Sequence, residues 1–317
     1  MSDWRPTAEF SALRRRAQLL SSVRALFATR GVLEVETPLL ASAPVTDPNI
    51  EAITTVAPDG DALMYLQTSP EFAMKRLLAA GSGPIYQICK AFRRGERGRR
   101  HNPEFTMLEW YRPGLSMAEL MDEVAAIVGL AVGPLSVKHH TYQHVFELHC
   151  GLNPHSASLD ELKACAHSHM DIHFDTDDRD TWLQLLMSSV IEPALDRESL
   201  SFVCDFPREQ AALAKTFINA DGVELAARFE AFYAGMELAN GYDELTDAGE
   251  LVRRIRHDHS RRADNDQVLP PIDRHLLKAM ASLPACVGVA VGFDRLSMLA
   301  CKAERIDEVI AFPLERA

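Results

Sequence analysis

Five arginines and one glutamate lie within the eight-residue run Arg93-Arg94-Gly95-Glu96-Arg97-Gly98-Arg99-Arg100. They give this run a local charge of +4, although the whole chain, with 33 Lys and Arg against 45 Asp and Glu, carries a formal charge of -12. A guanidinium group binds two phosphate oxygens at once, so an arginine-rich loop predicts a site for a nucleotide or another polyphosphate. The alternative is a solvated run of charge without a ligand.

Three glutamates follow one another at intervals of seven residues, at Glu230, Glu237 and Glu244. Carboxylates that lie close together bind Mg²⁺ or a cationic substrate, because hard cations prefer oxygen ligands. In one straight strand this spacing would place successive carboxylates on opposite faces. A turn at Ala234-Gly235 would instead fold the segment into a hairpin and bring Glu230 opposite Glu237. The alternative is three surface carboxylates on separate strand faces.

A strand of small residues leads into a helix at Gly288-Val289-Ala290-Val291-Gly292-Phe293-Asp294-Arg295. Small side chains let a ligand approach the backbone closely, and Arg295 at the start of the helix is placed to meet a phosphate. The alternative is a tight packing turn between a strand and a helix.

Histidine and cysteine offer other candidate chemistry. Eight of the 12 histidines fall within residues 139–173, and a helix there would bring His140 and His144 to one face. No spaced set of zinc ligands and no His-Glu-x-x-His run is present, so we expect scattered polar positions rather than a zinc site. The six cysteines are far apart in the sequence, which indicates reduced thiols. We expect Cys89 and Ser69 to be structural, because neither has a base nearby in the sequence.

The composition excludes several classes of protein. A net charge of -12 over 317 residues argues against a general nucleic-acid binder, which needs a broadly basic surface. The longest apolar stretch, near residues 285–293, is far shorter than the roughly 20 residues that span a bilayer, so no membrane helix is expected. The start, Met1-Ser2-Asp3-Trp4, shows no secretion signal, which indicates a cytoplasmic protein.

Hydrophobic spacing and capping residues predict the elements that carry these residues. The arginine run lies between two strand-like segments, residues 85–92 and 104–111, which predicts a long hairpin. Capping boxes at Ser116 with Glu119 and at Ser158 with Glu161 predict helices that reach about Gly129 and His167. Strands without regular alternation with helices predict an α+β fold, with a mainly antiparallel sheet flanked by helices. The other expected helices are residues 13–27, 70–81, 179–191, 248–262, 272–280 and one from 294. The other expected strands are residues 32–38, 63–67, 200–206, 223–232, 236–239 and 286–291. Residues 41–61 are expected to form a loop.

Three segments, in this order, resemble the signature motifs of class II aminoacyl-tRNA synthetases. The first is the opening helix with Gly31-Val32-Leu33-Glu34-Val35-Glu36-Thr37-Pro38, which resembles the dimer-forming motif. The second is the hairpin from Phe92-Arg93 to Trp110-Tyr111, which resembles the ATP hairpin. The third is Gly292-Phe293-Asp294-Arg295-Leu296. Within that family the chain is most similar to the lysine-specific branch, through Ser69-Pro70-Glu71, His101-Asn102-Pro103-Glu104-Phe105 and Glu237-Leu238-Ala239-Asn240-Gly241-Tyr242-Asp243-Glu244.

The resemblance implies a single class II synthetase-like catalytic domain over residues 1–317. Only 30 residues precede Gly31, too few for the anticodon-binding domain of lysyl-tRNA synthetases. The chain is therefore similar to the stand-alone paralogue that attaches (R)-β-lysine to a lysine of translation elongation factor P. This implies a homodimeric, AMP-forming ligase that uses ATP and Mg²⁺, takes (R)-β-lysine or lysine, acts on elongation factor P and needs no tRNA. The alternatives are a minimal lysyl-tRNA synthetase and a non-catalytic synthetase-like regulatory subunit.

The resemblance also implies a role for each matching residue. Arg93, Arg295 and Glu237 would be catalytic, with Arg93 on the α-phosphate and the substrate carboxylate and Arg295 on the γ-phosphate. Glu230 and Glu237 would bind Mg²⁺. ATP would also contact Arg94, Gly95, His101, Asn102, Phe105, Leu238 and Gly292, with Phe105 stacked on adenine. The lysine-like substrate would contact Ser69, Pro70, Glu71, Glu109, Tyr111, Asn240 and Glu244.

Two positions depart from the family pattern. Gly95 stands where synthetases usually have the glutamate that reads adenine, so Glu96 or backbone groups of Arg94 and Gly95 would take over this contact. Ala290 stands where synthetases favour glycine. One extra methyl group in a substrate pocket changes a binding free energy by about 1 to 3 kcal/mol, which is enough to favour an isomer of lysine.

Overall fold

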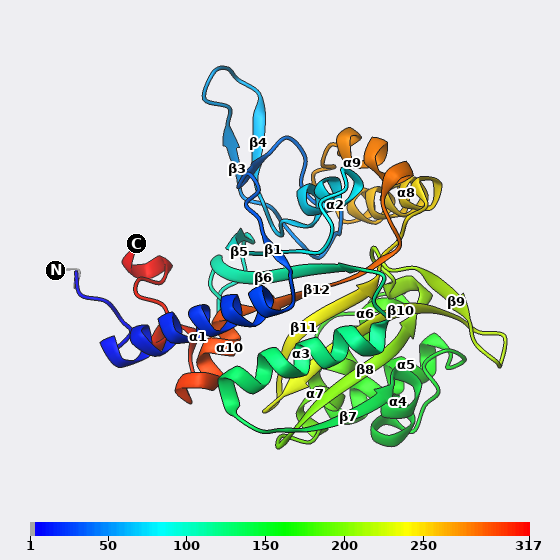
Figure 1. Ribbon diagram of the computed structural model, residues 1–317. Helices are drawn as coiled ribbons and strands as arrows, with labels where there is room; N and C mark the ends of the chain where they lie inside the picture. The colour runs from blue at the N-terminus through cyan, green and yellow to red at the C-terminus, as the bar shows by residue number, and fades with distance from the viewer. Residues whose placement is uncertain (1–3) are drawn as a thin grey trace. The chain divides into compact units, whose positions relative to one another are not determined.

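The computed structural model describes residues 4–317, so Met1–Asp3, which contribute to the prediction of a cytoplasmic protein, lie outside the described residues. The chain forms two compact units (Figure 1). Unit 1 contains the residues up to Gly133 together with Leu245–Ala317, and unit 2 is the continuous segment Pro134–Glu244. In the sequence, unit 2 is therefore inserted between the two parts of unit 1.

The main sheet of unit 1 has the strand order β1-β5-β6-β12. β5 (Ile85–Phe92), β6 (Glu104–Pro113) and β12 (Cys286–Gly292) pair antiparallel, whereas β1 (Leu33–Glu34) runs parallel to β5. This confirms the predicted hairpin on both sides of the arginine run. The expected strand over residues 32–38 is cut to two residues, because the chain leaves β5 before Pro38, which has no N–H to continue the ladder.

Residues 41–61 are not the uninterrupted loop that the sequence predicts. They contribute to a small antiparallel sheet with the order β2-β4-β3, formed by β2 (Leu40–Ala41), β3 (Thr54–Val56) and β4 (Leu63–Leu66). Strands of two and three residues have no periodic pattern to find, so the sequence did not reveal them.

Three helices of unit 1 cover one face of its main sheet: α1 (Phe10–Thr29), α3 (Met117–Val132) and α10 (Phe293–Cys301). The α1 side chain Phe27 stacks on Tyr86 of β5, with ring centroids 4.3 Å apart, and meets the edge of Trp110 of β6 at 5.4 Å. Neighbouring side chains in a strand point to opposite faces, so Glu109 and Tyr111 point away from these helices. The remaining helices of unit 1 are α2 (Glu71–Ala79), α8 (Ala248–Asp264) and α9 (Arg274–Ala279).

A buried polar network joins α10 to the rest of this layer. The carboxylate of Asp294, only 2% exposed as a residue, accepts a 2.7 Å hydrogen bond from the Thr106 N–H and pairs with Arg16 at 2.5 Å. Arg16 also donates to the Thr106 hydroxyl at 2.8 Å. Because buried charges are costly unless paired, this network fixes the start of α10 against both β6 and α1.

Unit 2 has the strand order β11-β10-β8-β7, with β9 (Thr216–Ile218) paired to β10. β7 (Ser136–Thr141) runs parallel to β8 (Ser199–Pro207), and β10 (Glu224–Tyr233) and β11 (Met236–Asp243) continue antiparallel. Its helices are α4 (Tyr142–Cys150), α5 (Leu159–His169), α6 (Arg179–Leu186), which continues as a π-helical turn, and α7 (Glu192–Ala194). The mostly antiparallel strands and flanking helices of the two units confirm the predicted α+β class.

The histidine-rich segment is not one helix. His140 lies on β7 and His144 on α4, because the Thr141 side chain accepts the His144 N–H at 3.1 Å and begins the helix only after His140. The expectation of a shared helix face was wrong, although the two rings still stack with centroids 5.8 Å apart. Among residues 4–317, no group of three or more His, Cys, Asp or Glu side chains is arranged to hold a metal ion.

None of the described helices is both long enough and apolar enough to cross a membrane.

Gly235 is required by the turn between β10 and β11. Its φ is +69°, and a Cβ placed there would lie 2.4 Å from a guanidinium nitrogen of Arg197. We expect Gly235→Ala to lower the free energy of unfolding by about 1 kcal/mol or more, mainly through the strained backbone. Thermal unfolding measures this, with Gly60→Ala as the control, since Gly60 has open space around its Cβ position. Equal melting temperatures of the two variants would contradict the prediction.

Candidate active site

Three strands place side chains on the face of the unit 1 sheet that lies opposite α1, α3 and α10. Residues directly opposite one another in antiparallel strands share a face. The register of β12 on β6 pairs Gly288 with Tyr111, Ala290 with Glu109, and Gly292 with Met107. Small residues of β12 therefore lie beside Glu109 and Tyr111 on this face.

Two predicted phosphate-binding arginines lie at the end of this face where β6 begins. The Arg93 guanidinium carbon lies 5.2 Å from the ring centroid of Phe105. From α10, Arg295 reaches the hairpin loop, where its Nη2 lies 2.6 Å from His101 Nε2. The structure thus brings Arg295 and His101 together, and it brings Arg93 to Phe105. These are the cationic and aromatic groups that a nucleotide needs.

The other arginines of the loop are largely committed to acidic residues. Exposed ion pairs join Arg94 to Glu51 at 3.0 Å, Arg97 to Glu315 at 2.5 Å, and Arg99 to Glu304 at 2.6 Å. The alternative of a solvated charge run therefore describes these three arginines well. Arg93 lies against Phe105 at the candidate site.

The departure at Gly95 has a local explanation. Gly95 has a φ of +80°, a conformation that favours glycine over glutamate. The next residue, Glu96, turns back and places Oε1 3.4 Å from Arg93 Nη1. The contact that reads adenine remains a prediction.

Asn102 has a structural use that the sequence did not show. Its side chain accepts the Leu314 N–H at 3.1 Å and donates to the Glu104 carbonyl oxygen at 2.6 Å, and the residue is only 7% exposed. These bonds fix the end of the hairpin loop. The predicted phosphate contact of Asn102 stays a prediction.

A buried carboxylate lies further along the same face. Glu109 is 2% exposed, and the Tyr111 hydroxyl donates a 2.6 Å hydrogen bond to its Oε1. Burial, followed by the Glu109 charge, raises the pKa of the Cys89 thiol to about 12, which supports a structural rather than a nucleophilic role for Cys89. A buried carboxylate is a natural partner for a substrate ammonium group.

The start of α2 supplies a second carboxylate. The Ser69 hydroxyl accepts the Glu71 N–H at 3.1 Å, but α2 begins at Glu71 with Pro70 in the N-cap position, so the expected start of this helix at Pro70 was one residue too early. The Glu71 carboxylate pairs with Lys75 at 2.6 Å, and Lys75 is 2% exposed. Sequence reasoning missed Lys75, although its position four residues after an acid on one helix is the signal for such a pair.

In unit 2 the turn at Ala234-Gly235 is confirmed, but the predicted pairing across it is wrong. Asn240, not Glu237, lies opposite Glu230, and Glu237 lies opposite Phe232. The two-residue turn pairs Tyr233 with Met236 and therefore Phe232 with Glu237, and a β-bulge between residues 231 and 232 then shifts the register by one more residue. A sequence pattern alone does not show such a shift.

Arg228 organises the carboxylates of unit 2, and sequence reasoning missed it as well. It pairs with Glu230 and donates to the Asn240 side chain at 3.2 Å and to the Gln210 carbonyl oxygen at 2.6 Å. Burial raises the pKa of Glu230 and the charge of Glu237 raises it further, while Arg228 opposes the increase. The negative charges of Glu230 and Glu237 therefore repel each other.

The predicted residues fall into two sets, one in each unit. Unit 1 holds Ser69, Pro70, Glu71, Arg93, Arg94, Gly95, His101, Asn102, Phe105, Glu109, Tyr111, Gly292 and Arg295; unit 2 holds Glu230, Glu237, Leu238, Asn240 and Glu244. Leu238 and Glu244 are buried, at 2% and 1% exposure.

Comparison with known proteins identifies the family of this fold and site. The family model described as tRNA synthetases class II (D, K and N) matches residues 1–316. The chain belongs to this family. The class II assignment confirms the resemblance that the three motifs carry.

Individual relatives of this class II chain are similar along their whole length. A Vibrio cholerae protein named elongation factor P–(R)-β-lysine ligase is 49% identical over 324 residues, which cover 100% of this chain and 99% of the relative. Proteins of the same name are 48% identical in Pseudoalteromonas translucida, covering 99% and 98% of the two chains, and 46% identical in Edwardsiella ictaluri, covering 100% and 99%.

Proposed function

We propose that this chain is an ATP-dependent ligase that activates (R)-β-lysine as an acyl-adenylate and transfers it to the ε-amine of a lysine on translation elongation factor P. The observation that carries the proposal is the full-length similarity, at 46–49% identity, to relatives named for this activity. The sheet face of unit 1 supports it, because arginines lie at one end and a buried carboxylate lies further along.

The reaction proceeds in two steps. The substrate carboxylate attacks the α-phosphate of ATP, which forms the acyl-adenylate and releases pyrophosphate; Arg93 and Arg295 neutralise the developing negative charge. Glu109 and Glu71 hold the ammonium groups of the substrate and orient its carboxylate. The lysine amine of elongation factor P then attacks the acyl carbon, so that an amide forms and AMP leaves. No covalent enzyme intermediate is required.

The carboxylates of unit 2 fit a Mg²⁺ ion. The charge of Glu237 raises the pKa of Glu230, a repulsion that a cation relieves. Mg²⁺ is usually bound through one or two carboxylates together with substrate phosphates, so a dedicated cluster of three protein ligands is not needed. When bound, the ion would neutralise phosphate charge.

A transfer assay tests this function. The enzyme is incubated with ATP, Mg²⁺, (R)-β-lysine and elongation factor P, and intact-protein mass spectrometry should show the gain of one β-lysyl group. Elongation factor P with its acceptor lysine changed to arginine is the control and should gain nothing. Efficient charging of tRNA with no gain on elongation factor P would overturn the proposal in favour of a minimal lysyl-tRNA synthetase. Absence of both activities would favour a regulatory subunit.

Ala290 gives a test of substrate preference. It lies directly opposite Glu109 in the sheet, so its methyl group borders the proposed ammonium site. We expect Ala290→Gly to shift preference from (R)-β-lysine toward α-lysine by about 5- to 100-fold in the ratio of kcat/KM values, as the removal of one methyl group from a pocket permits. Pyrophosphate exchange with each isomer measures the ratio. An unchanged ratio would remove Ala290 as a determinant of preference.

We also propose that the two units work together as one catalytic domain, that the chain forms a homodimer and that it needs no tRNA. Phe10 of α1 and Leu33 of β1, within the proposed dimer motif, are 67% and 56% exposed, which supports a partner surface there. Analytical ultracentrifugation measures the oligomeric state. A translation factor as the acceptor implies a cytoplasmic location.

A further inference from the structure

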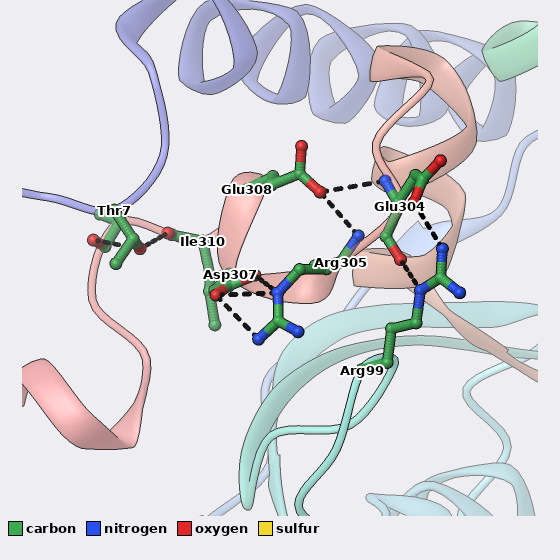
Figure 2. Close-up of polar contacts among 8 residues, drawn as sticks. Thr7, Arg99, Glu304, Arg305, Asp307, Glu308 and Ile310 are labelled. Atoms are coloured by element: carbon green, nitrogen blue, oxygen red, sulfur yellow. Dashed lines mark hydrogen bonds and ion pairs between the residues drawn. The ribbon is translucent and has the colours of Figure 1, made fainter.

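The segment Ala303–Arg316, called the C-terminal anchor below, contacts the hairpin loop of residues 93–103 at three places. The Ile306 N–H donates to the Arg99 carbonyl oxygen at 2.9 Å. The Glu304 carboxylate and carbonyl oxygen accept from the Arg99 guanidinium at 2.6 and 3.0 Å (Figure 2). The other two contacts are the Arg97–Glu315 ion pair and the hydrogen bond from the Leu314 N–H to Asn102.

The anchor is itself held firmly in unit 1. Ile306, Val309 and Ile310 are buried in an apolar cluster with Met298 of α10. The Glu308 carboxylate accepts the N–H groups of residues 304 and 305 at 3.0 and 2.7 Å, as Figure 2 shows. The Thr7 hydroxyl donates to the Ile310 carbonyl oxygen at 3.1 Å. The hairpin loop therefore contacts a segment that is itself fixed within unit 1.

The three contacts are unequal. Exposed ion pairs contribute little, and the Arg99 and Glu304 side chains are 59% and 80% exposed. The Leu314 N–H instead meets Asn102, which is 7% exposed, so its loss leaves a nearly buried amide oxygen without this donor. The adjacent residue, His101, is the one that Arg295 contacts.

We propose that the Leu314 N–H, acting through Asn102, is a positioning group that holds the hairpin loop in the conformation that binds ATP. This rests on the proposed use of ATP by the same site. A loop that is ordered before the ligand arrives does not lose conformational freedom on binding, and its affinity is correspondingly higher.

The chain offers a substitution that removes this single N–H. Leu314 is the first residue of a 3-10 turn, where proline is tolerated, and Pro313 has a ψ of 169°, which suits a residue that precedes proline. Leu314→Pro therefore deletes the donor and keeps the turn. Leu314→Ala is the matched control, because it shortens the same half-exposed side chain and keeps the N–H.

Two measurements test the proposal. Amide hydrogen exchange without nucleotide reports the order of residues 94–102, and calorimetric titration with Mg²⁺ and a non-hydrolysable ATP analogue reports affinity. We expect Leu314→Pro to speed exchange in the loop and to weaken binding by about tenfold, the effect of losing one hydrogen bond to a nearly buried group, with a raised KM for ATP and little change in kcat. Leu314→Ala should match the wild type.

The outcomes separate this inference from the proposed function. If Leu314→Pro matches Leu314→Ala in loop exchange or in affinity, the positioning role is overturned even though the enzyme uses ATP. If the wild-type protein binds no nucleotide, the proposed function fails instead. If Leu314→Pro fails to fold, a chain that ends after Pro313 is the second variant, because it also lacks the donor. It should show faster exchange in the loop and weaker nucleotide binding. Wild-type behaviour of that chain would overturn the proposal.

Discussion

Arg295→Ala is expected to slow adenylate formation by about 100- to 1,000-fold, the usual cost of removing a fixed group that stabilises charge in a transition state. Arg295 stands at the start of α10, where Asp294 is fixed by Arg16 and Thr106, and it contacts His101 of the loop. The guanidinium is therefore held in place before the substrate binds. Pyrophosphate exchange that depends on (R)-β-lysine measures the effect.

The control for Arg295 is Arg253→Ala, which removes an exposed arginine of α8 whose partner is Glu250. It should exchange pyrophosphate at the wild-type rate. Arg295→Lys should recover part of the lost rate, because it restores the charge but not the planar fork. Wild-type exchange by Arg295→Ala, with an unchanged circular dichroism spectrum, would remove Arg295 from the mechanism.

Glu109→Gln is expected to raise KM for (R)-β-lysine by about 100-fold while KM for ATP changes little. The substitution keeps the size of the side chain and removes the buried negative charge that we propose to hold an ammonium group. Tyr111→Phe removes only the hydroxyl that donates to Glu109, and we expect an increase of about fivefold. Steady-state exchange with each substrate varied in turn measures both variants.

The relative size of the two KM increases shows which group recognises the substrate. A larger loss for Tyr111→Phe than for Glu109→Gln would show that the hydroxyl, rather than the carboxylate, recognises the substrate. An equal increase in KM for ATP would indicate a distorted sheet face instead of a lost ammonium contact.

Local signals in the sequence predicted the parts of the fold that depend on nearby residues. Both capping boxes begin helices as expected, and the hairpin formed by β5 and β6 has the predicted start of each strand. The failures are short or lie in segments without a hydrophobic pattern. β7, α4 and β9 were missed: β9 has three residues, β7 is mostly exposed and polar, and the apolar pattern of α4 (Tyr142, Val145, Phe146) covers little more than one turn.

The candidate site likewise contains residues that the sequence could identify and residues that it could not. Residue identity was enough to nominate Arg93, Arg295 and Glu109, because their motifs are specific. Arg228 was missed, because its importance lies in the carboxylate that it pairs with in the folded chain, whereas Lys75 was overlooked although its spacing of four residues from Glu71 indicates the pair. The predicted partner of Glu230 was wrong, because the two-residue turn places Glu237 opposite Phe232, and a bulge shifts the register of Glu230 by one further residue.

The discontinuity of unit 1 sets the order in which a newly made chain can complete its parts. Unit 2 is one continuous stretch, whereas unit 1 is closed by pairs that are far apart in the sequence, such as Arg16 with Asp294 and Thr7 with Ala311. Synthesis proceeds from the N-terminus at about 5 to 20 residues per second, so all of unit 2 leaves the ribosome before α10 does. The phosphate end of the site, which needs α10 to bring Arg295 to His101, is therefore assembled last. A nascent chain therefore acquires the contact between Arg295 and His101 only after all of unit 2 has been synthesised.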